Sequence, residues 1–208
     1  GQALGSMSAV DEYIDALAGV MREDTTLIAW SLGGLLALRL AARFPDKVKR
    51  LILIASTAYF PCDEAGINGI DRAWLDSFSQ RFVDAPEKTL QRFMTLQVKG
   101  ERQAKPCLRL LQQLCTVSEY NMDECRAGLM LLSTMDVRAE LAQIGQQVRV
   151  IHGQNDAVLP LAAGQNLARY FSTDCHVIVD AGHVPHVSHP EAVAEAILQP
   201  WVESQSHH

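Results

Sequence analysis

Hydrophobic and polar positions follow two different periods along the chain. Four short runs of β-branched and apolar residues are typical of buried strands, at 25–30, 48–55, 148–152 and 175–179. Elsewhere, apolar residues recur three and four positions apart, which predicts helices at 8–22, 33–43, 161–170 and after Pro190. Strands that alternate with helices in this way predict an α/β fold with a parallel sheet and right-handed crossovers.

A long helical stretch interrupts this alternation. From about Asp71 to Leu132 the pattern is helical, and segments such as "EKTLQRFMTLQV" and "CLRLLQQLC" carry apolar residues three and four apart. We therefore divide the chain into a first part of an α/β core at 1–56, a loop and helical cap insertion at 57–135, and a second part of the core at 136–208.

The composition of the 208-residue chain limits the classes of function. Hydrophobic residues make up 48% of it, which is typical of a globular protein. The net charge of −6 gives no general attraction to nucleic acid, and no apolar run is long enough to span a membrane. Five cysteines without C-x-x-C spacing indicate neither a disulfide framework nor a zinc site, so we expect reduced thiols in a cytoplasmic protein.

The segment "LIAWSLGG" places Ser31 where a predicted strand turns directly into a predicted helix. This is the context of the G-x-S-x-G nucleophile elbow, a sharp turn that needs small residues on both sides of the serine. Here Ala29 and Gly33 take the two glycine positions. Ser31 is therefore a candidate nucleophile, and the alternative is a serine that only caps the following helix.

Two further residues complete a candidate triad. Asp156 in "NDAVLP" and His183 in "AGHVPHVSHP" each follow a predicted strand, so both are expected at the same edge of the sheet as Ser31. A serine hydroxyl needs such a base and an orienting acid to become a nucleophile, and the order Ser, Asp, His is that of α/β hydrolases.

Other interpretations exist for these residues as well. Asp156 is also suited to a turn or to capping the next helix, and Asp180 is a rival acid, although it lies only three residues from His183. His183, His186 and His189 recur every third residue, but prolines interrupt the segment and no carboxylate cluster accompanies them. We therefore expect neither a metal nor a cofactor.

The motifs "AWSLGGLLALRLAARFPDKVKRLILIAS", "NDAVLP" and "AGHVPHVSHP" resemble the α/β-hydrolase superfamily. The cap segments "EKTLQRFMTLQVKG" and "STMDVRAEL" narrow the resemblance to the pimeloyl-acyl-carrier-protein methyl ester esterases of biotin synthesis. The resemblance implies that Ser31 is the nucleophile, His183 the base and Asp156 its acid. It also implies an oxyanion donor at the Leu32 amide and substrate contacts at Trp30 and Phe93.

The resemblance further implies that basic cap residues meet an acidic acyl carrier protein. The matching positions here are Lys88, Arg92, Lys105 and Arg109. Residues 81–109 hold seven basic and three acidic side chains, a net charge of +4 within a chain of −6. Such a patch attracts an acidic partner, and the alternative is a solvated helix face without a partner.

The family pattern begins further upstream than this sequence. Its first strands and the His-Gly loop that supplies a second oxyanion N–H have no counterpart before Ser31. Loss of one oxyanion donor costs about 2.7–4 kcal/mol of transition-state stabilisation. We also expect the strand at 25–30 to be a sheet edge, open to association.

The function that the sequence favours is a serine carboxylesterase acting on the methyl ester of a carrier-bound acyl chain. Two alternatives remain open at this point. One is a hydrolase of small esters, lactones or C–C bonds, and the other is a non-catalytic truncated homologue.

Overall fold

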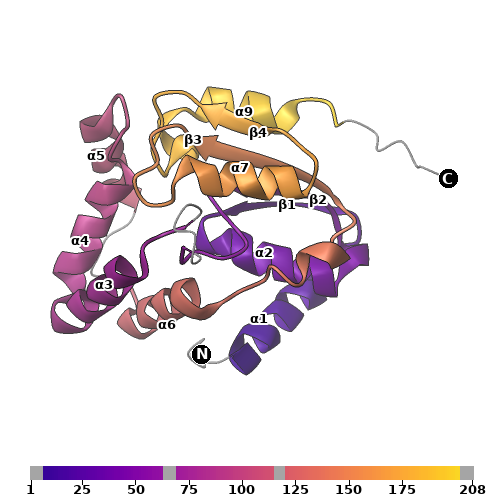
Figure 1. Cartoon of the computed structure of the whole chain (residues 1–208), viewed down its shortest axis with the longest axis horizontal. Helices are drawn as coiled ribbons and strands as arrows, with labels where there is room; N and C mark the ends of the chain where they lie inside the picture. Colours follow the sequence, from indigo (N-terminus) through magenta and orange to yellow (C-terminus); the bar gives the residue numbers. More distant parts are fainter. Residues whose placement is uncertain (1–6, 63–68, 115–119, 202–208) are drawn as a thin grey trace.

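A computed structural model of the chain describes residues 7–62, 69–114 and 120–201 (Figure 1). Its sheet has four strands in the order β1-β2-β3-β4, and every neighbouring pair is parallel. The strands are β1 (Thr25–Trp30), β2 (Val48–Ile54), β3 (Gln147–Gly153) and β4 (Cys175–Ile178). Within the described ranges β1 pairs only with β2, so it forms one edge of the sheet.

Helices cover both faces of this sheet. They are α1 (Met7–Val20), α2 (Leu32–Arg43), α7 (Leu161–Tyr170) and α9 (Pro190–Leu198), while the short α8 (Pro185–Ser188) packs against the cap through Val187. The first helix therefore begins one residue before the predicted start, with Ser8 inside it, and ends two residues earlier than predicted. The other predicted helices and strands lie within two residues of their expected bounds.

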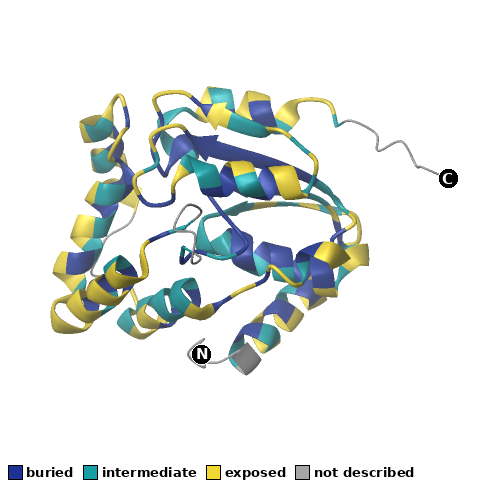
Figure 2. Ribbon diagram, in the orientation of Figure 1, coloured by how far each residue is buried: buried dark blue, intermediate teal, exposed yellow. Residues whose placement is uncertain are grey.

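The alternation of side chains along β2 explains why both faces need cover. Leu51 and Leu53 pack into the core cluster that includes residues of α2 and α7. Ile52 and Ile54, which point to the opposite face, pack with residues of α9. The apolar run from Leu51 to Ile54 is the expected result of burial on both faces, and Figure 2 shows the inner strand β3 almost entirely in the dark blue of buried residues.

The helical stretch between β2 and β3 forms a group of four helices, α3 (Arg72–Asp84), α4 (Pro86–Gln97), α5 (Ala104–Leu114) and α6 (Met122–Thr134). They lie together beside the sheet (Figure 1). The Asp71 and Asn121 side chains accept hydrogen bonds from the first turns of α3 and α6, which is how N-caps satisfy free amides. Val98 and Leu111 of this cap pack against Val184, next to one end of the sheet.

No helix among the described residues is both long and apolar enough to cross a membrane.

Candidate active site

Ser31 occupies the turn between β1 and α2. Its φ of 52° is unusual for a residue other than glycine, and the turn is held by hydrogen bonds on both sides. The Ser31 amide donates to the carbonyl of Ile54 (2.9 Å), and the Ser31 carbonyl accepts from the Gly34 amide (2.9 Å) and the Ser56 hydroxyl (2.8 Å). The Ser31 side chain makes no hydrogen bond to α2, which contradicts the alternative of a helix cap.

The glycine that this turn requires is Gly34. A Cβ atom there would lie 2.1 Å from Oγ of Ser56, whereas a Cβ atom at Gly33 would meet nothing within 4 Å. The expectation that Gly33 is needed for steric reasons is therefore wrong. The close approach occurs one residue later, where Gly34 in the first turn of α2 lies against Ser56 in the segment that follows β2.

Loops at the carboxyl ends of three strands bring together the side chains of Ser31, His183 and Asp156. Nε2 of His183 lies 2.9 Å from Oγ of Ser31, and Nδ1 of His183 lies 2.8 Å from Oδ2 of Asp156. The side chains of His183 and Asp156 are fully buried. This arrangement allows the imidazole to take a proton from the hydroxyl while the carboxylate holds the ring in the required tautomer.

The Asp156 carboxylate is surrounded by hydrogen-bond donors. Oδ1 accepts from the backbone amides of Val158 (2.8 Å) and Leu159 (2.9 Å), and Oδ2 faces His183. Burial by itself raises the pKa of Asp156, but hydrogen bonds from His152 and His183 outweigh it and hold the pKa well below its ordinary value. Asp156 is therefore ionised at neutral pH. Asp180, the rival acid, is exposed and has no contact with the imidazole in the described structure.

The loop that carries His183 is tied to its surroundings through its backbone. The indole N–H of Trp30 donates to the carbonyl of His183 (2.8 Å), and the amide of His183 donates to the carbonyl of Gln97 at the end of α4 (3.0 Å). The Trp30 ring also packs against the rings of His183 and His186. Trp30, predicted to contact substrate, thus lines the cavity and positions His183 as well.

A cavity of about 550 Å³ opens in front of Ser31, between the sheet and the cap. Aromatic side chains from the cap form much of its wall, among them Trp74, Phe78, Phe82 and Phe93. Leu32, the first residue of α2, also lines it. Its amide has no acceptor within its own helix, as at every helix start, and is available to an oxyanion. The predicted sites Leu32 and Phe93 therefore both lie at this cavity.

The four predicted docking residues are exposed on two neighbouring cap helices. Lys88 and Arg92 lie four residues apart on α4, and Lys105 and Arg109 lie four residues apart on α5. None of them forms an ion pair with another described residue. Their charges are therefore available to a partner.

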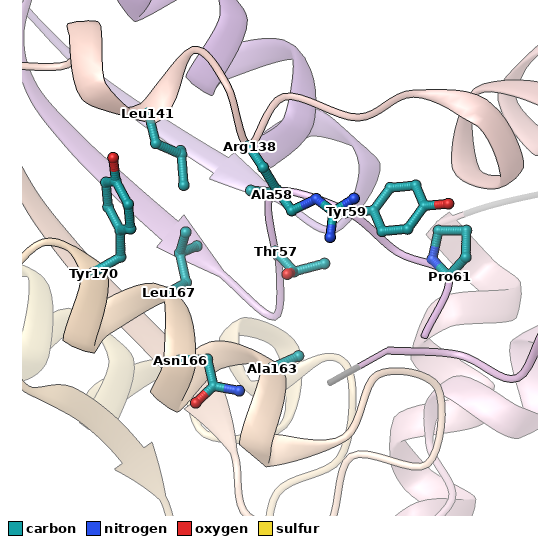
Figure 3. A pocket seen from close by; sticks show the side chains of 10 residues that line it. All are labelled: Thr57, Ala58, Tyr59, Pro61, Arg138, Leu141, Ala163, Asn166, Leu167 and Tyr170. Atoms are coloured by element: carbon teal, nitrogen blue, oxygen red, sulfur yellow. The ribbon is translucent and has the colours of Figure 1, made fainter. Parts of the chain in front are cut away.

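A second, smaller cavity of about 320 Å³ lies between α7 and the segments that follow β2 and α6 (Figure 3). It contains no member of the triad. Its guanidinium group, on Arg138, is paired with Asp136 (2.6 Å) and stacks on the ring of Tyr59. It is therefore separate from the candidate catalytic centre.

Three residues that contact the site were not predicted from the sequence. Ser56 holds the turn at Ser31, Gln97 holds the loop of His183, and His152 contacts the carboxylate of Asp156. Only His152 carried a signal, since it lies on a predicted strand four residues before Asp156. The contacts of Ser56 and Gln97 depend on how separate segments pack.

A family model described as the alpha/beta hydrolase family matches residues 2–196. The chain belongs to this family. Its similar relatives include a pimeloyl-[acyl-carrier protein] methyl ester esterase of Aromatoleum aromaticum, 37% identical over 90% of this chain and 78% of that protein. The esterase of the same name from Nitrosomonas europaea is 33% identical over 89% of this chain and 75% of its own length.

A biotin biosynthesis bifunctional protein of Teredinibacter turnerae is 34% identical to this α/β hydrolase over 90% of the chain, but the match spans only 35% of that longer protein. Among solved structures, a bromoperoxidase from Bacillus anthracis superposes with a TM-score of 0.83 at 17% identity, covering 95% of this chain and 74% of that one. An esterase from Exiguobacterium antarcticum gives a TM-score of 0.82 at 16% identity, over 94% of this chain and 73% of its own.

These matches confirm the predicted fold class and the resemblance drawn from the sequence. They also agree with the prediction of a carboxylic ester hydrolase, because the named relatives are esterases.

Proposed function

We propose that this α/β hydrolase is a serine carboxylesterase that cleaves the methyl ester of an acyl chain bound to an acyl carrier protein, as its relatives' names describe for them. The observation that carries the proposal is the continuous set of contacts from Ser31 through His183 to Asp156 at the mouth of an apolar cavity. The alternatives of a general small-ester hydrolase and of a non-catalytic homologue differ from it in measurable ways.

In the proposed reaction, Oγ of Ser31 attacks the ester carbonyl while Nε2 of His183 takes its proton. The Leu32 amide donates to the oxygen that becomes negatively charged. His183 then protonates the departing methoxide, so that methanol leaves and an acyl-enzyme remains. Water attacks this intermediate with the same base, and the carboxylic acid and free Ser31 are restored.

The cavity and the cap support the substrate class. An apolar wall that includes Phe78 and Phe93 suits a hydrocarbon chain, because burying each methylene contributes about 0.8 kcal/mol. The basic side chains of α4 and α5 suit the acidic surface of a carrier protein that presents such a chain.

Charge reversal on the cap tests the carrier protein as partner. We expect the double variant Arg92→Glu with Arg109→Glu to lower kcat/KM for a methyl ester on an acyl carrier protein by about tenfold or more, because opposite charges speed encounter. The same variant should change kcat/KM for a free short-chain ester by less than about twofold, since its chemistry does not involve the cap charges. The rate of methanol release gives kcat/KM for both substrates.

Arg169→Glu is the matched control, since Arg169 is exposed on α7 outside the cap. It should leave both substrates unaffected. Equal losses for carrier-bound and free esters in the cap variant would contradict carrier docking and favour a general esterase. Absence of any ester hydrolysis by the well-folded chain would favour the non-catalytic homologue.

We further propose that copies of this chain associate through the open edge of β1. Ile28 on this strand is 54% exposed, and the segment "TTLIAW" contains neither the proline nor the lysine that discourages edge pairing. Size-exclusion chromatography with light scattering is expected to show oligomers that Ile28→Lys converts toward monomer. A monodisperse monomer of the unaltered chain would overturn this part of the proposal.

A further inference from the structure

His152 is a fully buried histidine that the proposed reaction does not use. It lies near the end of β3, with Nε2 at 3.0 Å from the carbonyl oxygen of Leu159 and at 3.2 Å from Oδ2 of Asp156. Both neighbours are acceptors, so the hydrogen must be on Nε2 for either contact to be favourable. Nδ1 has no hydrogen-bond partner among the described residues.

His152 adds a longer donor contact to those around Asp156, because the Nε2–H that bonds to the Leu159 carbonyl (3.0 Å) also faces Oδ2 (3.2 Å). Oδ1 already accepts two backbone amides, and Oδ2 faces Nδ1 of His183 at 2.8 Å and Nε2 of His152 at 3.2 Å. A carboxylate has about four lone-pair sites, and each of them here faces a donor, three at hydrogen-bond distance and the fourth, from His152, at the longer contact. Rotation of this carboxylate away from His183 would therefore break several charge-assisted hydrogen bonds in a buried environment.

The imidazole of His152 is held from its other side by α7. Gly164 of this helix lies against the ring, and a Cβ atom there would be 2.4 Å from Nδ1. Glycine in a helix interior destabilises the helix relative to alanine, so its presence here needs a packing reason. The absent side chain lets α7 approach β3 closely enough to press the ring toward Asp156.

From these contacts we infer that His152 is a positioning residue, a second imidazole on the acid of the triad that keeps the Asp156 carboxylate ionised and aimed at His183. The inference rests on the proposed function, because it assumes that Asp156 orients the catalytic base. It assigns a role to a side chain that does not touch the reacting atoms.

The experiment measures how fast a fluorophosphonate labels Ser31 in the whole chain, as a function of pH. We expect His152→Leu to lower the plateau rate constant about 10- to 100-fold, the effect of removing one hydrogen bond to a charged group. The loss should also raise the pKa of Asp156 toward its ordinary value, because one stabilising donor is gone.

His152→Gln is the conservative variant, because its Nε2 amide can donate where the imidazole Nε2 does. It should restore labelling to within about threefold of the original chain. His176→Leu is the matched control, since His176 lies on the neighbouring strand β4 and should leave the profile unchanged. Cooperative thermal melting shows that each variant is folded.

Gly164→Ala tests the same ring without altering it. The added methyl group should displace the imidazole and slow labelling about tenfold in the original chain. It should have little effect in the His152→Gln background, which has no atom at the Nδ1 position. This pair of variants decides the question if His152→Leu does not fold.

An equal effect of Gly164→Ala in both backgrounds, or an unchanged plateau rate constant in a folded His152→Leu variant, would overturn the positioning role. The proposed function fails separately, if the unaltered chain is labelled at Ser31 but hydrolyses no carboxylic ester. Absence of labelling in the unaltered chain contradicts both.

Discussion

Replacing Ser31 by alanine is expected to lower kcat for ester hydrolysis by about five orders of magnitude. Without Oγ no acyl-enzyme forms, and the imidazole of His183, 2.9 Å from that oxygen, loses the group from which it takes a proton. His183→Ala should have an effect of the same size, because the hydroxyl is a poor nucleophile without its base. The two losses should not add, since the residues act as a unit.

Turnover of a p-nitrophenyl ester and labelling by a fluorophosphonate measure these losses. Ser77→Ala is the matched control, since Ser77 is an exposed serine on α3 whose hydroxyl contacts only Arg81 among the described residues. Labelling that persists in Ser31→Ala would show that the nucleophile is another residue. Turnover that persists in His183→Ala would show that His183 is not the base.

Asp156→Asn is expected to lower kcat by about 10⁴-fold while leaving the shape of the site intact. The backbone amides of Val158 and Leu159 need an acceptor, so the carboxamide oxygen should occupy the position of Oδ1. Its NH₂ group then takes the position of Oδ2 and faces Nδ1 of His183. The imidazole must present a bare nitrogen there, which places its hydrogen on Nε2 and prevents it from accepting a proton from Ser31.

The control for this change is Asp180→Asn, which alters the rival carboxylate. Asp180 is exposed, and its amide contacts Gln154 rather than the triad, so kcat should change by less than about twofold. The histidine tautomer can be followed directly by ¹⁵N NMR of the imidazole. A loss in Asp180→Asn as large as that in Asp156→Asn would show that the acid is wrongly assigned.

The candidate triad could be predicted from the sequence because each member follows a strand directly. In a parallel sheet the carboxyl ends of the strands meet at one edge, so Ser31, Asp156 and His183 are brought near one another by topology alone. The predicted strands were recognisable because burial on both faces requires apolar residues at nearly every position. The edge position of β1 was instead expected from the resemblance to α/β hydrolases.

The supporting contacts could not be predicted in this way. Gln97 reaches His183 through its backbone carbonyl, and every residue type has such a carbonyl. The steric need for glycine fell on Gly34 rather than Gly33, because it depends on where Ser56 passes and not on the spacing from Ser31. Sequence patterns carry no record of such distances between segments.

The sequence by itself determined the α/β alternation, the helical cap and the three residues of the candidate triad, since these follow from local periodicity and from positions at strand ends. Only the tertiary structure decided which donors surround Asp156. The approach of His152 to that carboxylate, and the glycine at 164 that admits its ring, depend on how closely α7 packs on β3. Such packing arises from contacts between segments distant along the chain, and for this reason it left no periodic signal in either segment.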